Sequence, residues 1–176
     1  FPSDGVIERL DFPFWNASQR KYELIGTFFA SLAQELKNVD LKTSVDIFGL
    51  AAWRAMDFSF DLNIGQRMVD ALPYFDYVSP MVYPSHYPDN FDGFKKPAAK
   101  PYEIVLGSLK TWQELKATTS AKAELRPWLQ DFTLGGVTYD KTKVRAQIQA
   151  AYDAGIDSWL LWNSSNVYTR GALLAP

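Results

Sequence analysis

A regular alternation of helical and strand-like segments constrains the fold of this chain more than any other feature. Apolar residues at helical spacing predict helices over residues 18–38, 64–72, 102–118 and 141–154. Short apolar runs predict four strands, at residues 41–50, 74–83, 124–132 and 156–162. Because these runs are apolar almost throughout, they are typical of a parallel sheet covered by helices. The sequence therefore predicts an α/β fold built from parallel (β/α) units.

Local signals mark several boundaries of these elements. Ser18 is the predicted N-cap of the first helix, and Asp140 and Gly155 are placed to cap the two ends of the last one. Pro80 lacks the N–H that a neighbouring strand needs, so we expect a weakened strand or a bulge there. Residues 84–100 form a long loop with several aromatic residues, and loops of this length are usually functional or disordered.

Two architectures share this alternation, an open doubly wound sheet and a (β/α)₈ barrel. A doubly wound nucleotide-binding domain would be expected to carry a glycine-rich phosphate turn, and neither G-x-G-x-x-G nor G-x-x-x-x-G-K-[ST] occurs. In a barrel, functional residues follow the carboxyl ends of several strands. Polar and aromatic residues stand at that place in each predicted unit, which favours the barrel.

Four strands make only half of such a barrel, because a complete one has eight strands in about 250 residues. The 176 residues then form a single partial domain, the C-terminal half of a TIM-type barrel with strands five to eight. A half-barrel leaves two strand edges and one sheet face without partners. We therefore expect the missing N-terminal half, or a second copy of the chain, to close it, and no robust activity from the isolated chain.

Composition excludes several classes of function. Lys and Arg number 18 against 20 Asp and Glu, so the chain offers no basic surface for nucleic acid. No apolar stretch approaches the ~20 residues that cross a bilayer, so we predict no membrane span. With no Cys and one His, thiolate and polyhistidine metal sites are impossible, and we predict no metal or cofactor. Aromatic residues make up 15% of the chain, so some rings are expected to face solvent or a ligand.

Four segments of the sequence resemble a bacterial family of glycoside hydrolases with an amylase-like (β/α)₈ barrel. They are FPSDG at residues 1–5, SVDIFGL at 44–50, VSPMVYPSHY at 78–87 and RPWLQDF at 126–132. The resemblance is to the C-terminal half of that barrel. It implies a saccharide substrate and a further catalytic carboxylate on the strand before residue 1. An envelope or extracellular location would follow from a polysaccharide substrate alone.

Asp46 and Asp131 are the candidate catalytic carboxylates, since hydrolysis of a glycosidic bond ordinarily needs two. Asp46 stands in a β-branched run, where a buried charge is costly unless it is hydrogen-bonded or catalytic. A structural bond to the backbone or to Arg54 is the alternative. Asp131 follows the third strand beside Gln130, and both can point into the barrel only if the strand has already bent. Structural and catalytic interpretations of Asp131 stay open.

The candidate substrate-binding residues are aromatic and amide side chains at the same strand ends. Rings can stack on the apolar face of a pyranose, and amide and imidazole groups can hydrogen-bond its hydroxyls. They are Tyr83, His86, Tyr87, Trp128, Gln130, Trp162 and Asn163. For the rings the alternative is packing in the core, and for His86 it is an exposed loop position without a role.

We therefore predict a glycoside hydrolase that acts on an oligo- or polysaccharide by carboxylate acid/base chemistry. The alternative is a non-catalytic carbohydrate-binding or scaffold domain that keeps the barrel and its aromatic rings. Both interpretations require the strand ends to meet at one mouth, where Asp46, Tyr83, Asp131 and Asn163 should converge.

Overall fold

The computed structural model describes residues 18–173, so the FPSDG segment lies outside the described residues. Within this range the helices are α1 (Lys21–Leu36), α2 (Gly49–Trp53), α3 (Met68–Ala71), α4 (Pro101–Ala117) and α5 (Lys141–Asp153). The strands are β1 (Ser44–Phe48), β2 (Tyr77–Val82), β3 (Glu124–Leu125), β4 (Trp128–Gln130) and β5 (Leu160–Trp162). No helix of residues 18–173 is long and apolar enough to span a membrane.

The strands form one parallel sheet, which confirms the predicted mixed α/β fold. Their order is β1-β2-β4-β5, and β3 also pairs with β2. Each of these pairs is parallel. The order thus follows the chain, whereas the strand order of a doubly wound sheet reverses at a switch point.

Proline explains why the strand expected over residues 124–132 is two short strands instead. β3 pairs with the start of β2 and β4 with its end, so the gap between them faces Pro80. In a parallel strand, every second residue directs its N–H and C=O towards the same neighbouring strand. The carbonyl of Val78 accepts a hydrogen bond from the N–H of Arg126, so Val78 and Pro80 both face the segment of β3 and β4. Pro80 has no N–H to offer there. β2 itself runs through Pro80, which pairs with Ile47, so the weakening falls on the neighbouring strand.

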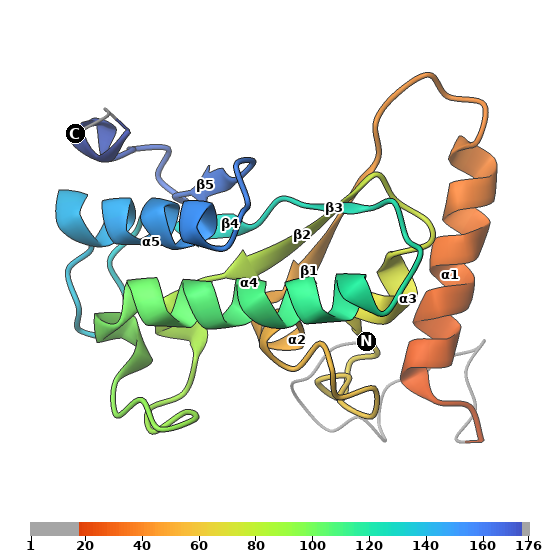
Figure 1. The fold of residues 1–176 in the computed structure, drawn as a ribbon, viewed down its shortest axis with the longest axis horizontal. Coiled ribbons are helices and arrows are strands. Elements are labelled where there is room, and N and C mark those ends of the chain that lie inside the picture. The colour runs from red at the N-terminus through yellow and green to blue at the C-terminus, as the bar shows by residue number, and fades with distance from the viewer. Residues whose placement is uncertain (1–17, 174–176) are drawn as a thin grey trace.

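One face of the sheet is buried under helices. Side chains alternate between the two faces of a strand, and on this face Ile47, Val78, Val82 and Leu129 belong to the main apolar core. Helices α2, α4 and α5 lie across the sheet in Figure 1, and their apolar side chains complete that core.

The opposite face, which we call the open face, is much less covered. In strand register it carries Ser44, Asp46, Phe48, Ser79, Met81, Trp128, Gln130 and Trp162. Phe48 is 49% exposed and Trp162 43%, and Asp46 is exposed as well. The sequence predicted a parallel sheet covered by helices, and among the described residues these helices cover one of its two faces.

Helix α1 lies at the edge of the fold beside α3 (Figure 1). The predicted helix is confirmed, but Phe29 is the one residue of its apolar stripe that is fully buried among the described residues. Phe29 packs edge-on against Phe75, with ring centroids 5.3 Å apart, while Phe28 is 57% exposed. The apolar side of α1 is therefore only partly covered.

Backbone conformation corrects the helix expected over residues 64–72. Asn63 has φ 56° and Gly65 has φ 82°, a left-handed conformation that a right-handed helix does not contain. The helix is therefore confined to α3, which begins at Met68.

The helix caps agree with the sequence at α5 and differ at α1. The carboxylate of Asp140 accepts a hydrogen bond from the N–H of Lys143, and Gly155 has φ 73° just past the helix, which confirms both predicted caps. At α1 the N-cap is Arg20 instead of Ser18. The carboxylate of Glu23 accepts a bond from the N–H of Arg20 and fixes this start.

The long loop over residues 84–100 is anchored by an aromatic cluster. The Trp53 ring contacts the rings of Tyr87, Phe91 and Phe94 at centroid distances of 5.3 to 6.2 Å. Its Nε1 donates a hydrogen bond of 2.8 Å to Asp92 in the same loop. The loop is thus held against α2, and its start can carry site residues in fixed positions.

Candidate functional site

Asp46 lies in the middle of β1 on the open face. Its Oδ1 accepts a hydrogen bond of 3.0 Å from Nε1 of Trp128. The interpretation of Asp46 as a buried charge is wrong, because Asp46 is exposed on this face. The described partner of its carboxylate is the Trp128 indole instead of Arg54.

Two tryptophans extend this arrangement across the open face. The rings of Trp128 and Trp162 meet edge to face, with centroids 5.9 Å apart and planes at 87°. Since Trp128 bonds to Asp46 through the edge of its ring, its indole is fixed from two sides. Asp46 and the two rings thus form a continuous polar and aromatic surface from β1 to β5.

Tyr83, His86 and Phe132 form a second cluster on the loops that follow β2 and β4. Their ring centroids lie 5.3 to 5.8 Å apart, all edge to face. Burial, and secondarily the charge of Asp46, raises the pKa of Tyr83, so its phenol stays neutral. Partial burial lowers the pKa of His86 below its ordinary value, which favours the neutral imidazole. A neutral phenol and imidazole can each donate and accept hydrogen bonds.

Gln130 and Asn163 hold loops together, and their polar atoms are already occupied. Gln130 is fully buried; its Oε1 accepts from the N–H of Ser85 and its Nε2 donates to the carbonyl of Phe132. The Nδ2 of Asn163 donates to the carbonyls of Asp131 and Val167. The substrate-binding roles of both amides stay predictions, because their described partners are protein groups.

Tyr87, in the loop after β2, is buried. It is 4% exposed, and its hydroxyl lies 2.9 Å from the hydroxyl of Ser108 on α4. Its ring also packs in the Trp53 cluster. The predicted stacking of Tyr87 on a sugar stays a prediction, and the described contacts are those of a core residue.

Asp131 lies just past the end of β4, so the chain can place it and Gln130 on the same side. Its side chain is 2% exposed. One carboxylate oxygen accepts a 2.7 Å bond from the N–H of Thr169, and the other accepts a 2.6 Å bond from the Thr169 hydroxyl. Both oxygens are therefore engaged with the segment that follows β5. The catalytic role of Asp131 stays a prediction beside this anchoring one.

Replacing Thr169 by Val tests the anchoring role. The variant keeps the shape of the side chain but removes the hydroxyl donor to a buried carboxylate, so we expect a loss of about 1.5–3 kcal/mol in the free energy of unfolding. Urea titration followed by circular dichroism measures it. The double variant with Asp131→Asn should lose less than the sum of the two single losses. Additive losses would contradict a coupling between these side chains.

A small apolar cavity of about 130 Å³ lies at the carboxyl ends of β1 and β2. Its walls are formed by Phe48, Gly49, Leu50, Met81, Tyr83, His86 and Tyr87, so the buried Tyr87 borders this cavity as well. The cavity thus joins the open face to the Tyr83 cluster.

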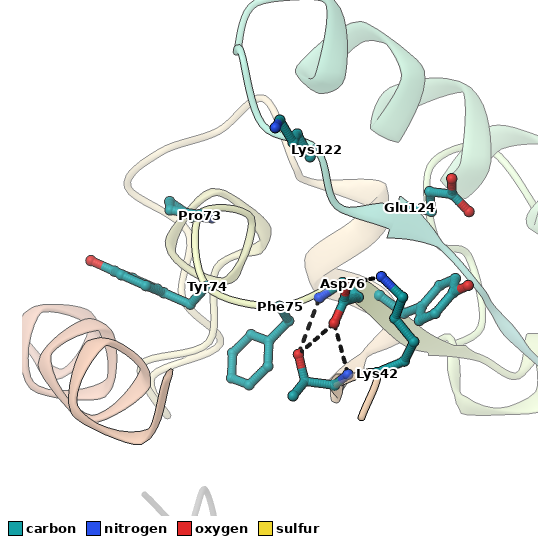
Figure 2. A pocket seen from close by; sticks show the side chains of 9 residues that line it. Lys42, Pro73, Tyr74, Phe75, Asp76, Lys122 and Glu124 are labelled. Atoms are coloured by element: carbon teal, nitrogen blue, oxygen red, sulfur yellow. Dashed lines mark hydrogen bonds and ion pairs between the residues drawn. The ribbon is translucent and has the colours of Figure 1, made fainter. Parts of the chain in front are cut away.

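A larger hollow of about 390 Å³ lies at the amino ends of β1, β2 and β3 (Figure 2). There Asp76 accepts hydrogen bonds from Nζ of Lys42 and from the N–H of Thr43. These bonds, that of Lys42 first, lower the pKa of Asp76 to about 2. In parallel α/β sheets, ligands bind outside the carboxyl ends of the strands. We therefore assign this hollow to the scaffold.

The stability that Asp76 provides should depend on pH. Its pKa in the folded state is lower than the ~3.9 of an unfolded chain, so its contribution is complete above about pH 4 and is lost as pH falls towards 2. We expect Asp76→Asn to destabilise the protein at neutral pH and to lose this disadvantage near pH 2. Urea unfolding at both pH values measures it, with Asp89→Asn, an exposed loop carboxylate, as control. If Asp76→Asn destabilises the protein equally at neutral pH and near pH 2, the role of this charge is contradicted.

Comparison with known families adds a finding to this geometry. A family described as "Putative glycosyl hydrolase domain" matches residues 1–168. The chain belongs to this family. No curated protein matches the chain. Membership in a glycosyl hydrolase family points to saccharides as the class of substrate, and it confirms the family resemblance of the four sequence segments.

For this glycosyl hydrolase domain, the structure also adds site residues that sequence reasoning missed. Phe48 and Met81 could have been found, because each lies two residues along the strand from Asp46 or Ser79 and so shares its face. Phe132 and Thr169 had no such signal. Among residues 18–173, no group of three or more His, Asp or Glu side chains is placed to hold a metal ion.

Proposed function

We propose that this chain is half of a (β/α)₈-barrel glycoside hydrolase domain, with its site on the open face and Asp46 as an acid/base carboxylate. The observation that carries the proposal is the exposed Asp46, hydrogen-bonded to Trp128 on a face lined by aromatic rings. Exposed rings beside a carboxylate suit an oligo- or polysaccharide, since a pyranose offers an apolar face and a ring of hydroxyls.

Two of the predicted binding residues fit this role directly. Trp162 is 43% exposed and can stack on a sugar, and Trp128 orients the Asp46 carboxylate while presenting its own ring. His86 and Tyr83 can hydrogen-bond sugar hydroxyls from the loop above. Asp131 remains the candidate for a second carboxylate from this chain, and the Thr169 experiment tests its anchoring to the segment after β5.

The half-barrel part of the proposal is supported by what the described fold leaves uncovered. Strand order follows the chain, helices cover one face of the sheet, and the outer edges of β1 and β5 have no described partner strand among residues 18–173. Helix α1, which lies beside α3, is only partly covered as well. A further half-barrel or a second copy would cover these surfaces. Size-exclusion chromatography of the 176-residue chain should show self-association, and a stable compact monomer would contradict it.

Hydrolysis of a glycan panel by the full-length protein tests the catalytic proposal. Release of reducing ends from at least one oligo- or polysaccharide is the expected result. If no member of a broad panel is cleaved, the enzymatic proposal fails.

A second candidate is a carbohydrate-binding domain without catalysis. The buried and doubly bonded Asp131 favours it, because Asp46 would then stand without a second carboxylate from this chain. Calorimetry separates the two candidates. Saccharide binding without hydrolysis, lost in Trp128→Ala but kept in Asp46→Asn, would favour the binding domain.

A further inference from the structure

The apolar cavity at the ends of β1 and β2 lies beside Asp46. Phe48, in its wall, follows Asp46 by two residues on β1, so the two side chains leave the strand on the same face. Tyr83, also in its wall, is close enough for the charge of Asp46 to raise its pKa. A sugar bound with its reacting bond at Asp46 would therefore place a neighbouring substituent at this cavity.

The size of the cavity limits what it can hold. Pockets for whole drug-sized ligands measure about 300–1,000 Å³, whereas this cavity measures about 130 Å³. It has room for a substituent of a few heavy atoms rather than for a sugar ring.

The lining decides the chemistry of that substituent. Phe48, Leu50 and Met81 offer the cavity hydrocarbon and thioether surface. The rings of Tyr83, His86 and Tyr87 complete the lining, which is apolar over most of its surface. A sugar hydroxyl that enters among Phe48, Leu50 and Met81 would give up its bonds to water without replacement, which is unfavourable. A methyl group makes no hydrogen bonds to water that it would have to give up, and the removal of its apolar surface from water is favourable.

We propose that this cavity is the specificity pocket of the carbohydrate site and accepts the methyl end of a sugar substituent. The inference rests on the proposed function, because it places the sugar at Asp46. Two kinds of sugar carry this chemistry, the acetyl group of an N-acetylated sugar and the C6 methyl of a 6-deoxy sugar. Plain hexoses carry a hydroxyl at the corresponding positions and are disfavoured.

Calorimetry with matched saccharides tests the proposal on the full-length protein. One pair is the β-1,4 trimer of N-acetylglucosamine against the β-1,4 trimer of glucose. The other is methyl β-quinovoside against methyl β-glucoside, which differ in the C6 hydroxyl. We expect the methyl-bearing member of at least one pair to bind roughly 10–200-fold more tightly, the range for small apolar groups in apolar pockets. The pair that shows the preference identifies the source of the methyl group.

A variant in the cavity wall tests whether the preference for methyl-bearing saccharides arises in this cavity. Phe48→Ser removes apolar wall from a side chain that is 49% exposed, so the fold should survive and the preference should shrink. Phe58→Ser is the matched control, since Phe58 is 50% exposed and does not line the cavity. An unchanged preference in Phe48→Ser would overturn the assignment to this cavity.

The binding and hydrolysis experiments test the specificity pocket and the proposed hydrolase function separately. Equal binding within each pair would overturn the specificity pocket, while hydrolysis of the glycan panel would leave the proposed function standing. Absence of binding by all of these saccharides would overturn the pocket as well, and the panel would still decide the enzymatic proposal independently.

Discussion

Replacing Asp46 by Asn is expected to lower kcat for glycoside hydrolysis by about 10²–10⁴-fold, the usual contribution of a positioned acid or base. Asn keeps the size of the side chain, and its carbonyl oxygen can still accept the hydrogen bond from Trp128. It cannot carry the negative charge or exchange a proton. The fall should therefore be in kcat, with saccharide affinity largely kept, and steady-state kinetics on the best panel substrate measures both.

Asp89→Asn is the matched control for this experiment. Asp89 is an exposed loop carboxylate that lines neither the apolar cavity nor the open face, so its variant should turn over substrate at the parent rate. Undiminished turnover in Asp46→Asn would remove Asp46 from the mechanism. An equal loss in both variants would point to a general effect of charge.

Replacing Trp112 by Ala is expected to cost about 3–5 kcal/mol in the free energy of unfolding, the range for a large aromatic side chain deleted from a core. Trp112 is 1% exposed and lies on the buried stripe of α4 with Leu109 and Leu115. The cavity left behind would sit where α4 meets the main core. Urea titration followed by far-ultraviolet circular dichroism measures the change.

Trp162→Ala serves as its control, since it deletes the same kind of ring at a position 43% exposed. We expect this variant to lose much less stability, because a large part of the removed surface was already in contact with water. A loss in Trp112→Ala no larger than that in Trp162→Ala would contradict the place of Trp112 in the core.

Repeating local patterns made the fold predictable. The helical stripe of α4, the caps at Asp140 and Gly155, and the apolar runs of β1 and β2 each depend on neighbours in sequence, which a single chain displays. Predicted helix boundaries were wrong where the backbone conformation of one residue interrupted the apolar pattern, as at Gly65 before α3. The division of residues 124–132 falls at Arg126 and Pro127 and faces Pro80 of β2, so it involves a proline in each of the two segments.

The contacts of the candidate site were less predictable for a physical reason. The strand pattern predicts that Asp46, Gln130 and Asp131 approach one rim, but it does not reveal which of them other protein groups will engage. Asp131 is engaged by Thr169, which lies 38 residues further along the chain. Similarly, an apolar run cannot reveal whether its second face is covered by the same half of a fold or by another.

The sequential strand order also bears on how the protein is made. Each strand pairs with one that leaves the ribosome before it, so β1 and β2 can associate while the C-terminal units are still being synthesised. The sheet can therefore assemble in the direction of translation, one strand and its covering helix at a time.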